Sequence, residues 1–335
     1  MTVKVAINGF GRIGRNVLRA IIESKRKDIE VVAINDLGPV ETNAHLFRFD
    51  SVHGRFPGTV TVSGDTIDVG RGPIKVTAIR DPKDLPHKAL GVDIAFECTG
   101  IFTTRDKAAA HLAAGAKRVL VSAPCDGADF TVVYGVNHHE LTKDHVVVSN
   151  ASCTTNCLAP VVRVLHDTVG IDKGFMTTIH AYTGDQPTLD TMHKDLYRGR
   201  AAAMSMIPTS TGAAKAIGLV IPELKGKLDG SSIRVPTPDV SLVALTAHVG
   251  KKTSVEEVNA AMKAASEGSL KGILGYEETE LVSSDFIGDT RSSVLDVAST
   301  AVVGGDLVSV QAWYDNEWGF SCRMVDLARL AGREG

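Results

Sequence analysis

A glycine-rich turn between a short strand and a helix, near the N-terminus, constrains the fold more than any other feature of the sequence. The run VKVAIN, residues 3–8, is apolar and β-branched, which is typical of a buried strand. It is followed at once by GFGRIG, and RNVLRAIIESK then shows the apolar spacing of a helix over residues 15–25. A second strand-like run, IEVVAIND, covers residues 29–36. A strand, a helix and a strand in this order predict a βαβ unit, which is normally parallel and right-handed.

The same alternation continues to about residue 150. Residues 104–116 predict a helix that ends at Gly115, and strand-like runs surround it. These runs are VDIAFECTG (92–100), KRVLVSAP (117–124), VVYGVN (132–137) and HVVVSN (145–150). We therefore predict a Rossmann-type, doubly wound parallel α/β domain over residues 1–152. Because 335 residues are too many for one core of ordinary size, a second domain is expected over residues 153–318.

The second domain is predicted to be of the α+β class, with a mixed or antiparallel sheet and helices. A helix is expected over residues 254–268, with Ser254 as its N-cap and Gly268 at its end. The C-terminal run SCRMVDLARLAGR predicts a helix over about 319–335 that returns to complete the first domain. The clearest strand-like runs of the second domain are residues 233–250 and 307–316.

The glycine turn carries the spacing of a dinucleotide-binding loop. Gly9, Gly11 and Gly14 form Gly-x-Gly-x-x-Gly between a strand and a helix, and Asp36 ends the second strand 22 residues after Gly14. Gly9 permits the tight turn, Gly11 lets the backbone approach a pyrophosphate, and Gly14 lets helix and strand pack closely. Asp36 would accept hydrogen bonds from ribose hydroxyls and repel a 2′-phosphate, so NAD is the expected cofactor. The alternative is a structural turn that binds no ligand.

Two cysteines four residues apart stand out in SNASCTTNCLAP, residues 149–160. A zinc site would need a second ligand pair beside Cys153 and Cys157, and none lies at a suitable spacing, so no metal is predicted. If the segment is helical, the two Cβ atoms lie about 5–6 Å apart. A disulfide requires about 3.8 Å. A nucleophilic cysteine is therefore the favoured interpretation.

Only one of the two cysteines is well placed for nucleophilic chemistry. The segment from 153 onward has helical apolar spacing with Ser152 as its N-cap, so Cys153 lies at the N-terminus of the helix, where an anion is favoured. That effect is worth less than about one pKa unit, whereas an imidazolium at about 4 Å contributes up to about 4 kcal/mol. A histidine partner is thus expected, and His180, at the end of the strand-like run FMTTI, is the best candidate. Cys157 is interpreted as a small buried apolar residue.

Charge and composition limit which partners and which cellular compartment are expected. The formal net charge of −3 gives no reason to expect a nucleic-acid or membrane partner. The N-terminal residues lack the apolar stretch of a signal peptide, and no run of about 18 apolar residues occurs. Five cysteines, an odd and small number, are typical of free thiols in a reducing cytoplasm.

Six motifs, in order along the chain, resemble the phosphorylating glyceraldehyde-3-phosphate dehydrogenase family. They are INGFGRIGR, SNASCTTNCLAP, HAYTGDQ, PTSTGAAKA, RVPTPDVS and WYDNEWGFS. The resemblance implies that Cys153 attacks the aldehyde of glyceraldehyde 3-phosphate and that His180 acts as the general base. It further implies NAD as hydride acceptor, an acyl thioester, and release of 1,3-bisphosphoglycerate by inorganic phosphate. A homotetramer, with the polar stretch 181–206 at a subunit interface, is also implied.

The resemblance assigns ligands to two anions, the substrate phosphate and the incoming phosphate. Arg198 is compatible with either site, although without the resemblance it would be taken as a solvated or intersubunit charge. One set is Thr183, Arg198 and Arg234, and the other is Ser152, Thr154, Thr211 and Gly212.

The remaining family positions are cofactor contacts. Phe320 replaces the tyrosine of many members, and Thr191 and Met192 replace a Leu-Pro pair of many NAD-specific bacterial members, which puts the strictness of the NAD preference in question. The positions that match cofactor contacts are Gly9, Gly11, Arg12, Ile13, Gly14, Asp36, Arg80, Ser122 and, for the nicotinamide carboxamide, Asn316.

Three other functions remain open. Erythrose-4-phosphate dehydrogenase uses the same chemistry with water, but Asn35-Asp36 and Ala181-Tyr182-Thr183 disfavour it. A cysteine hydrolase would leave the glycine loop unexplained. A non-catalytic NAD-binding or interaction protein would not need Cys153 together with His180.

Overall fold

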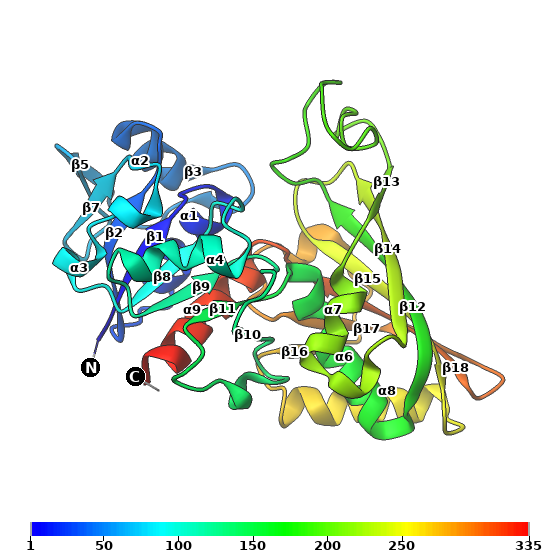
Figure 1. Ribbon diagram of the computed structural model, residues 1–335. Coiled ribbons are helices and arrows are strands. Elements are labelled where there is room, and N and C mark those ends of the chain that lie inside the picture. Colours follow the sequence, from blue (N-terminus) through cyan, green and yellow to red (C-terminus); the bar gives the residue numbers. More distant parts are fainter. Residues whose placement is uncertain (1, 334–335) are drawn as a thin grey trace. The chain divides into compact units, whose positions relative to one another are not determined.

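The structure is a computed structural model that describes residues 2–333, and its chain divides into two compact units (Figure 1). The first contains the described residues up to Val132, then His139–Ala151, and the chain from Ser321 onward. The second contains Val133–His138 and Ser152–Phe320. The predicted C-terminal helix is observed as α9 (Trp318–Arg333). Residues 1, 334 and 335, which the predicted first domain includes, lie outside the described residues.

The first unit is built on a nine-stranded sheet in the order β10-β11-β9-β8-β1-β2-β7-β6-β5. All neighbours from β10 to β7 are parallel, and only β6 and β5 at one edge are antiparallel. Because β2 and β8 lie on opposite sides of β1, the sheet is doubly wound, as predicted, and ligands of such sheets bind at this switch point. The strands are β1 (Val3–Asn8), β2 (Ile29–Asn35), β5 (Thr61–Ser63), β6 (Thr66–Asp68), β7 (Pro73–Thr77), β8 (Ile94–Glu97), β9 (Arg118–Val121), β10 (Phe130–Thr131) and β11 (Val147–Ser149).

Short helices and one small hairpin complete this unit. The hairpin consists of β3 (Phe49–Asp50) and β4 (Gly54–Arg55). The central strands β8 and β9 are buried at every position, as expected for parallel strands covered on both faces. Besides α9, the helices are α1 (Arg12–Glu23), α2 (Val40–Arg48), α3 (His87–Leu90), α4 (Arg105–Ala108) and α5 (Ala110–Ala113), with 3₁₀ turns η1 (Pro82–Asp84) and η2 (His138–Glu140).

Of the elements predicted for the first half, one helix is interrupted and one strand is wrong. The helix expected over 104–116 is split into α4 and α5, because ψ of −12° at Ala109 tightens the turn and the Leu112 N–H bonds only three residues back. The strand expected over 132–137 is a turn, since the Val133 N–H donates to the Asn137 side chain at 2.8 Å. Apolar composition alone does not separate a strand from such a buried turn.

The second unit is built on a seven-stranded mixed sheet, as predicted, in the order β13-β14-β12-β15-β18-β17-β16. The pairs β12–β14 and β16–β17 are parallel and the others are antiparallel. The strands are β12 (Ile171–Ala181), β13 (Ile207–Ser210), β14 (Leu228–Val235), β15 (Ser241–Val249), β16 (Leu274–Glu277), β17 (Ser293–Val303) and β18 (Leu307–Tyr314). The helices are α6 (Cys153–Val169), α7 (Ala213–Val220) and α8 (Val255–Glu267), with 3₁₀ turns η3 (Pro222–Leu224) and η4 (Ser283–Phe286).

Helix α6 packs on the sheet between α7 and α8, and it contacts both of these helices as well as β17 and β18 (Figure 1). Its start is fixed locally, because the Ser152 hydroxyl accepts a hydrogen bond from the Thr155 N–H at 3.0 Å. The helix continues through Pro160 to Val169. Its N-terminus therefore presents Cys153 at a defined position beside the end of β12. Within residues 2–333, no helix combines the length and apolarity needed to cross a bilayer.

Candidate active site

The glycine loop of the first unit has the shape that a bound dinucleotide requires. Gly9 adopts φ of +88°, and a Cβ there would lie 2.8 Å from the Thr99 amide nitrogen. A Cβ on Gly14 would lie 2.1 Å from the Gly9 carbonyl oxygen, whereas one on Gly11 would meet nothing within 4 Å. Gly9 and Gly14 are therefore required by the fold. Gly11 instead leaves open space in front of the α1 N-terminus, which no side chain caps, so a pyrophosphate fits there.

The carboxylate of Asp36 is held against this loop at the end of β2. Its two oxygens accept hydrogen bonds from the Phe10 N–H at 3.0 Å and the Gly38 N–H at 2.9 Å. Both are backbone donors, so the carboxylate has a fixed orientation and keeps acceptor capacity for a ribose hydroxyl. This geometry fits the predicted role of Asp36, and the loop and Asp36 lie within one unit.

The other predicted cofactor contacts of the first unit are less specific in position. Arg12 forms an ion pair with Asp50, so its guanidinium is held by an internal carboxylate. Ile13 and Ser122 are half-buried, and Arg80 is exposed. Asn316 belongs to the second unit, where it is buried and its side-chain oxygen accepts from the Ser241 hydroxyl at 2.7 Å.

In the second unit the structure brings the predicted nucleophile and base together. Cys153 is the first residue of α6 and His180 is the last but one of β12. Their side chains meet with Sγ 3.5 Å from Nε2. His180 is only 4% exposed, and Tyr314 packs its ring edge-to-face against the imidazole at 5.9 Å between centroids. The imidazole is therefore fixed in place with one nitrogen turned to the thiol.

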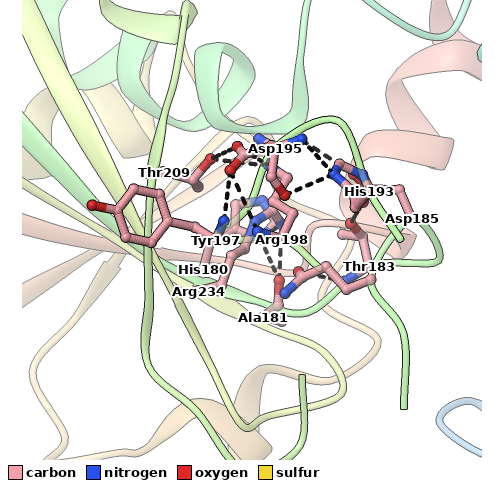
Figure 2. A network of polar contacts seen from close by, with 11 residues as sticks. His180, Ala181, Thr183, Asp185, His193, Asp195, Tyr197, Arg198, Thr209 and Arg234 are labelled. Atoms are coloured by element: carbon pink, nitrogen blue, oxygen red, sulfur yellow. Dashed lines mark hydrogen bonds and ion pairs between the residues drawn. The ribbon is translucent and has the colours of Figure 1, made fainter. Parts of the chain in front are cut away.

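Two groups compete for the other nitrogen of His180, and they belong to the polar network of Figure 2. Nδ1 lies 2.7 Å from the Ala181 carbonyl oxygen and 2.7 Å from Nη1 of Arg234. Arg234 also donates to the Ala181 oxygen at 3.0 Å. If Nδ1 carries the proton it donates to Ala181, and Nε2 is then a free base facing Cys153. If Arg234 donates to Nδ1, the proton lies on Nε2. The Ala181 carbonyl thus favours the tautomer that can accept the thiol proton.

The charge balance at this pair differs from the sequence-based argument. Burial, followed by the positive charge of Arg234, lowers the pKa of His180 to about 3, so the imidazole is neutral. Burial raises the pKa of the Cys153 thiol, and Arg234 and the N–H groups at the start of α6 oppose that rise. These pKa shifts do not favour the His180 imidazolium that the sequence-based argument expected as the main charge beside the thiolate. Arg234 is the nearby cation, and sequence reasoning had assigned it only to phosphate binding.

The first predicted anion site is a connected cluster of polar side chains. The Thr183 hydroxyl donates to Asp185 at 2.7 Å, and Nη1 of Arg198 donates to the second Asp185 oxygen at 3.1 Å. Nε of Arg198 also donates to the Thr209 hydroxyl at 2.9 Å (Figure 2). Nε of Arg234 is buried and has no hydrogen-bond partner among the described residues. Thr183, Arg198 and Arg234 thus lie in one cluster. In this structure the Asp185 carboxylate accepts the hydrogen bonds of Thr183 and Arg198.

The second predicted anion site is more dispersed. Ser152 caps α6, and the Thr211 hydroxyl accepts from the Ala213 N–H at 3.2 Å beside Gly212, the N-cap of α7. The Thr154 hydroxyl is buried and lies 2.9 Å from the hydroxyl of Tyr314. An anion would therefore reach the backbone of Thr154 more readily than its hydroxyl.

Sequence reasoning missed two residues of the site. Tyr314 is 2% exposed, and its hydroxyl joins Thr154 in α6 to Thr178 in β12 at 2.9 Å each. It thereby fixes the spacing between the elements that carry Cys153 and His180. Asp185 is the other, and both lie in motifs that resemble the family, WYDNEWGFS and HAYTGDQ. Apart from that motif, the only signal for Tyr314 in the sequence was its place in the strand-like run 307–316.

Cys157 is buried, as predicted, and its surroundings differ from those of Cys153. It is 0% exposed, and its sulfur lies 3.5 Å from the Ser293 hydroxyl and 3.7 Å from the Ala312 carbonyl oxygen. Burial raises the pKa of its thiol to about 12. Among the described residues the five cysteines form no disulfide.

A loop that fits a dinucleotide and a thiol beside a neutral imidazole are the parts that an NAD-dependent aldehyde dehydrogenase with a covalent step requires. Residues 3–105 match the family described as glyceraldehyde 3-phosphate dehydrogenase, NAD binding domain, and residues 152–316 match its C-terminal domain. The chain is 75% identical over 335 residues to glyceraldehyde-3-phosphate dehydrogenase of Xanthobacter flavus, with all of both chains covered. It is 72% identical over 333 residues to that of Cereibacter sphaeroides, with 99% of both chains covered, and 58% identical over 336 residues to that of Geobacillus stearothermophilus, with both chains fully covered.

The chain therefore belongs to the glyceraldehyde-3-phosphate dehydrogenase family, and the resemblance of its motifs is confirmed. It is an NAD-dependent phosphorylating dehydrogenase, with NAD as its cofactor. The erythrose-4-phosphate alternative is not favoured.

Proposed function

We propose that Cys153 and His180 are the nucleophile and the base with which this enzyme oxidises and phosphorylates glyceraldehyde 3-phosphate to 1,3-bisphosphoglycerate. The observation that carries the proposal is the 3.5 Å approach of Sγ to Nε2 at the N-terminus of α6. Because the imidazole is neutral, its Nε2 accepts the thiol proton as the sulfur attacks the aldehyde carbon. A C–S bond forms, and the carbonyl π bond becomes an oxyanion beside the N–H groups at the helix start.

The thiohemiacetal formed by that attack then passes through two further steps, hydride loss and attack by phosphate. NAD, when bound, supplies the hydride acceptor for the thiohemiacetal carbon. The acyl group stays on Cys153 as a thioester until inorganic phosphate attacks its carbon and the C–S bond breaks. The thiolate that leaves is stabilised by Arg234 and recovers a proton from His180. The neutral starting pair is thereby restored.

We assign the anions to the two clusters described above. Thr183, Arg198 and Arg234 form one, and the partnerless Nε of Arg234 supports it, since a buried guanidinium N–H without an acceptor favours an anionic ligand. A bound phosphate would replace Asp185 as acceptor for Thr183 and Arg198. The other set comprises Ser152, Thr154, Thr211 and Gly212. The proposed cofactor contacts are Gly9, Gly11, Arg12, Ile13, Gly14, Asp36, Arg80, Ser122 and Asn316.

We also propose a cytoplasmic homotetramer. Support for assembly comes from the segment 181–206, which exposes several large apolar side chains without regular secondary structure before β13. Met192 is 96% exposed and Leu196 is 85% exposed, and such a concentration is typical of an interaction surface. The other exposed apolar residues of this segment are Leu189, Tyr197, Met204 and Met206.

NADH formation from glyceraldehyde 3-phosphate, measured with and without phosphate, tests the proposal. Rapid turnover that requires phosphate and is lost in Cys153→Ser is expected. Turnover that is independent of phosphate would point to water as the attacking group, and efficient use of erythrose 4-phosphate would favour the sister activity. If Cys153→Ser kept near-normal turnover, the assignment of the nucleophile would be wrong.

A further inference from the structure

Four adjacent strands of the first unit carry polar residues at their carboxyl ends, in one line across the sheet. Thr77, Asn35, Asn8 and Glu97 are paired in register from β7 through β2 and β1 to β8. We call these four residues the strand-end row. Three of them are buried, with exposed fractions of 7% for Asn35, 3% for Asn8 and 1% for Glu97.

The side chains of the row are linked by hydrogen bonds that all run in the same donor-to-acceptor direction. The Thr77 hydroxyl donates to the Asn35 oxygen at 2.8 Å, and the Asn35 amide donates to the Asn8 oxygen at 2.8 Å. The Asn8 amide then donates to Glu97 at 2.6 Å. The orientation of both amides is therefore consistent along the chain, and every donor points toward the Glu97 carboxylate. Such aligned bonds strengthen one another in a buried environment.

A second arm reaches the same carboxylate from α5 and α3. Nε2 of His111 lies 2.9 Å from Glu97, and Nδ1 of His111 lies 2.9 Å from Nε2 of His87. Because a carboxylate only accepts, His111 must carry its proton on Nε2, and a neutral His111 then accepts from His87. Nδ1 of His87 is buried without a hydrogen-bond partner among the described residues, which suits a nitrogen that carries no proton. Burial also lowers the pKa of His87 to about 4, so the ring is neutral. This arm is thus also polarised toward Glu97.

The remaining oxygen of Glu97 holds the loop after β8. It accepts from the Thr99 N–H at 2.8 Å and from the Thr99 hydroxyl. The Thr99 backbone lies directly against Gly9, at the distance where a Cβ on that glycine would clash. Along the chain, Asn8 immediately precedes Gly9 and Asn35 immediately precedes Asp36. The row therefore fixes the backbone from which the glycine loop and Asp36 begin.

A buried carboxylate is a poor way to obtain stability alone, because well-packed apolar residues at such positions are often as stabilising. We propose that Glu97 is a positioning residue for NAD, which orders the glycine loop and Asp36 through Thr99 and the strand-end row. The inference rests on the proposed assignment of that loop to NAD. Glu97 does not itself touch the cofactor in this scheme.

The main test is Glu97→Gln, which keeps the size of the side chain but replaces one acceptor by a donor. The new NH2 group must then face either the N–H of Thr99 or the donors of Asn8 and His111. Either contact places two donors against each other and is repulsive. We expect the dissociation constant for NAD, measured by calorimetry on the apo enzyme, to rise about 10- to 100-fold, as for loss of buried charged hydrogen bonds. Hydrogen exchange at the Gly9 and Thr99 amides should accelerate. The KM for glyceraldehyde 3-phosphate should change less than about twofold, because those ligands belong to the other unit.

A pair of His111 variants keeps the proposal testable if Glu97→Gln does not fold. His111→Gln retains a donor for Glu97 and should bind NAD within about twofold of wild type, whereas His111→Leu removes it and should weaken binding about 3- to 10-fold. Ile67→Val, a fully buried change in β6 away from the row, is the stability control. Lower melting temperature with unchanged NAD affinity in Glu97→Gln, or equal affinity in both His111 variants, would overturn the inference. Unchanged NAD binding in Gly11→Val would instead show that the loop itself was assigned wrongly.

Discussion

At the residue scale, the surroundings of each sulfur atom and each carboxylate decide its chemistry. Cys153 and Cys157 lie one turn apart on α6, but only Cys153 has a base, a cation and the helix N–H groups around it. Cys157 has none of these and no exposed surface. Since the thiolate is the reactive form, the two thiols should differ strongly in reactivity.

Brief treatment of the folded enzyme with iodoacetamide near pH 7 should label Cys153 first and abolish dehydrogenase activity. Peptide mapping gives the site of labelling. Cys157→Ser should keep most of the activity, because its sulfur makes only packing contacts and long hydrogen bonds. Earlier labelling of Cys157 than of Cys153 would contradict this reading.

The pH dependence of that labelling should depend more on Arg234 than on His180. A fixed positive charge lowers the pKa of the thiol, so Arg234→Leu should move the midpoint of the alkylation profile to higher pH. The same change should raise the pKa of His180, because the charge that opposes protonation is removed. His180→Asn removes a group that is neutral above about pH 3, so it should slow labelling with a smaller shift of the midpoint. A larger shift of the midpoint in His180→Asn than in Arg234→Leu would show instead that the His180 imidazolium is the main charge that stabilises the thiolate.

Cofactor choice should depend on Asp36. Its carboxylate is held by two backbone N–H groups and cannot easily turn away from a 2′-phosphate. Asp36→Ala should therefore lower the ratio of kcat/KM for NAD to that for NADP by about tenfold or more, as for removal of one charge repulsion of about 1.4 kcal/mol. Asp84→Ala, which removes an exposed carboxylate of η1 outside the proposed cofactor contacts, is the charge-matched control and should leave the ratio unchanged. Equal use of both cofactors by the wild type would exclude this role.

At the element scale, the helix termini place the functional groups, and their caps can be measured individually. Helix α8 begins with a full capping box, in which the Ser254 hydroxyl accepts from the Glu257 N–H at 3.3 Å and Glu257 accepts from the Ser254 N–H at 3.2 Å. Helix α6 also has a serine N-cap, Ser152, but this residue adjoins Cys153 and cannot be changed without affecting the chemistry.

Ser254→Ala should lower the free energy of unfolding by about 1 kcal/mol and leave kcat unchanged. Denaturant unfolding of the two variants Ser254→Ala and Ser266→Ala measures the difference, because Ser266 lies in the last turn of the same helix and caps nothing at its start. We expect Ser266→Ala to lie within about 0.5 kcal/mol of wild type. Equal losses in both variants would show that the cap has no special role.

At the scale of the whole molecule, assembly should depend on the segment 181–206. Met192→Glu and Leu196→Glu place charges on its most exposed apolar side chains. If the segment forms a subunit interface, each change should reduce the mass measured by light scattering from that of four chains to a smaller species. Leu219→Glu in α7, where the leucine is 64% exposed, is the matched control and should leave the mass unchanged. A wild type that is already monomeric would exclude the tetramer.

The sequence by itself determined the features whose causes are local. The glycine spacing, the buried β-branched runs and the caps Ser152 and Ser254 each act within a few residues, so β1, α1, α6 and α8 could be predicted. Where local signals were ambiguous the prediction failed, as at Ala109 and in residues 132–137, because small or apolar residues suit a helix, a strand or a buried turn equally well.

Only the tertiary structure decided which distant side chains meet. Arg234 reaches His180 because β12 and β14 are parallel and pair these two residues in register. Tyr314 joins α6 to β12 across 160 and 136 positions of sequence, and Glu97 gathers donors from β1 and α5. Sheet register and burial together fix these contacts. Burial also decides which of the side chains in contact stay charged. The protonation state of the Cys153–His180 pair is therefore a property of the fold, which no local pattern in the sequence specifies.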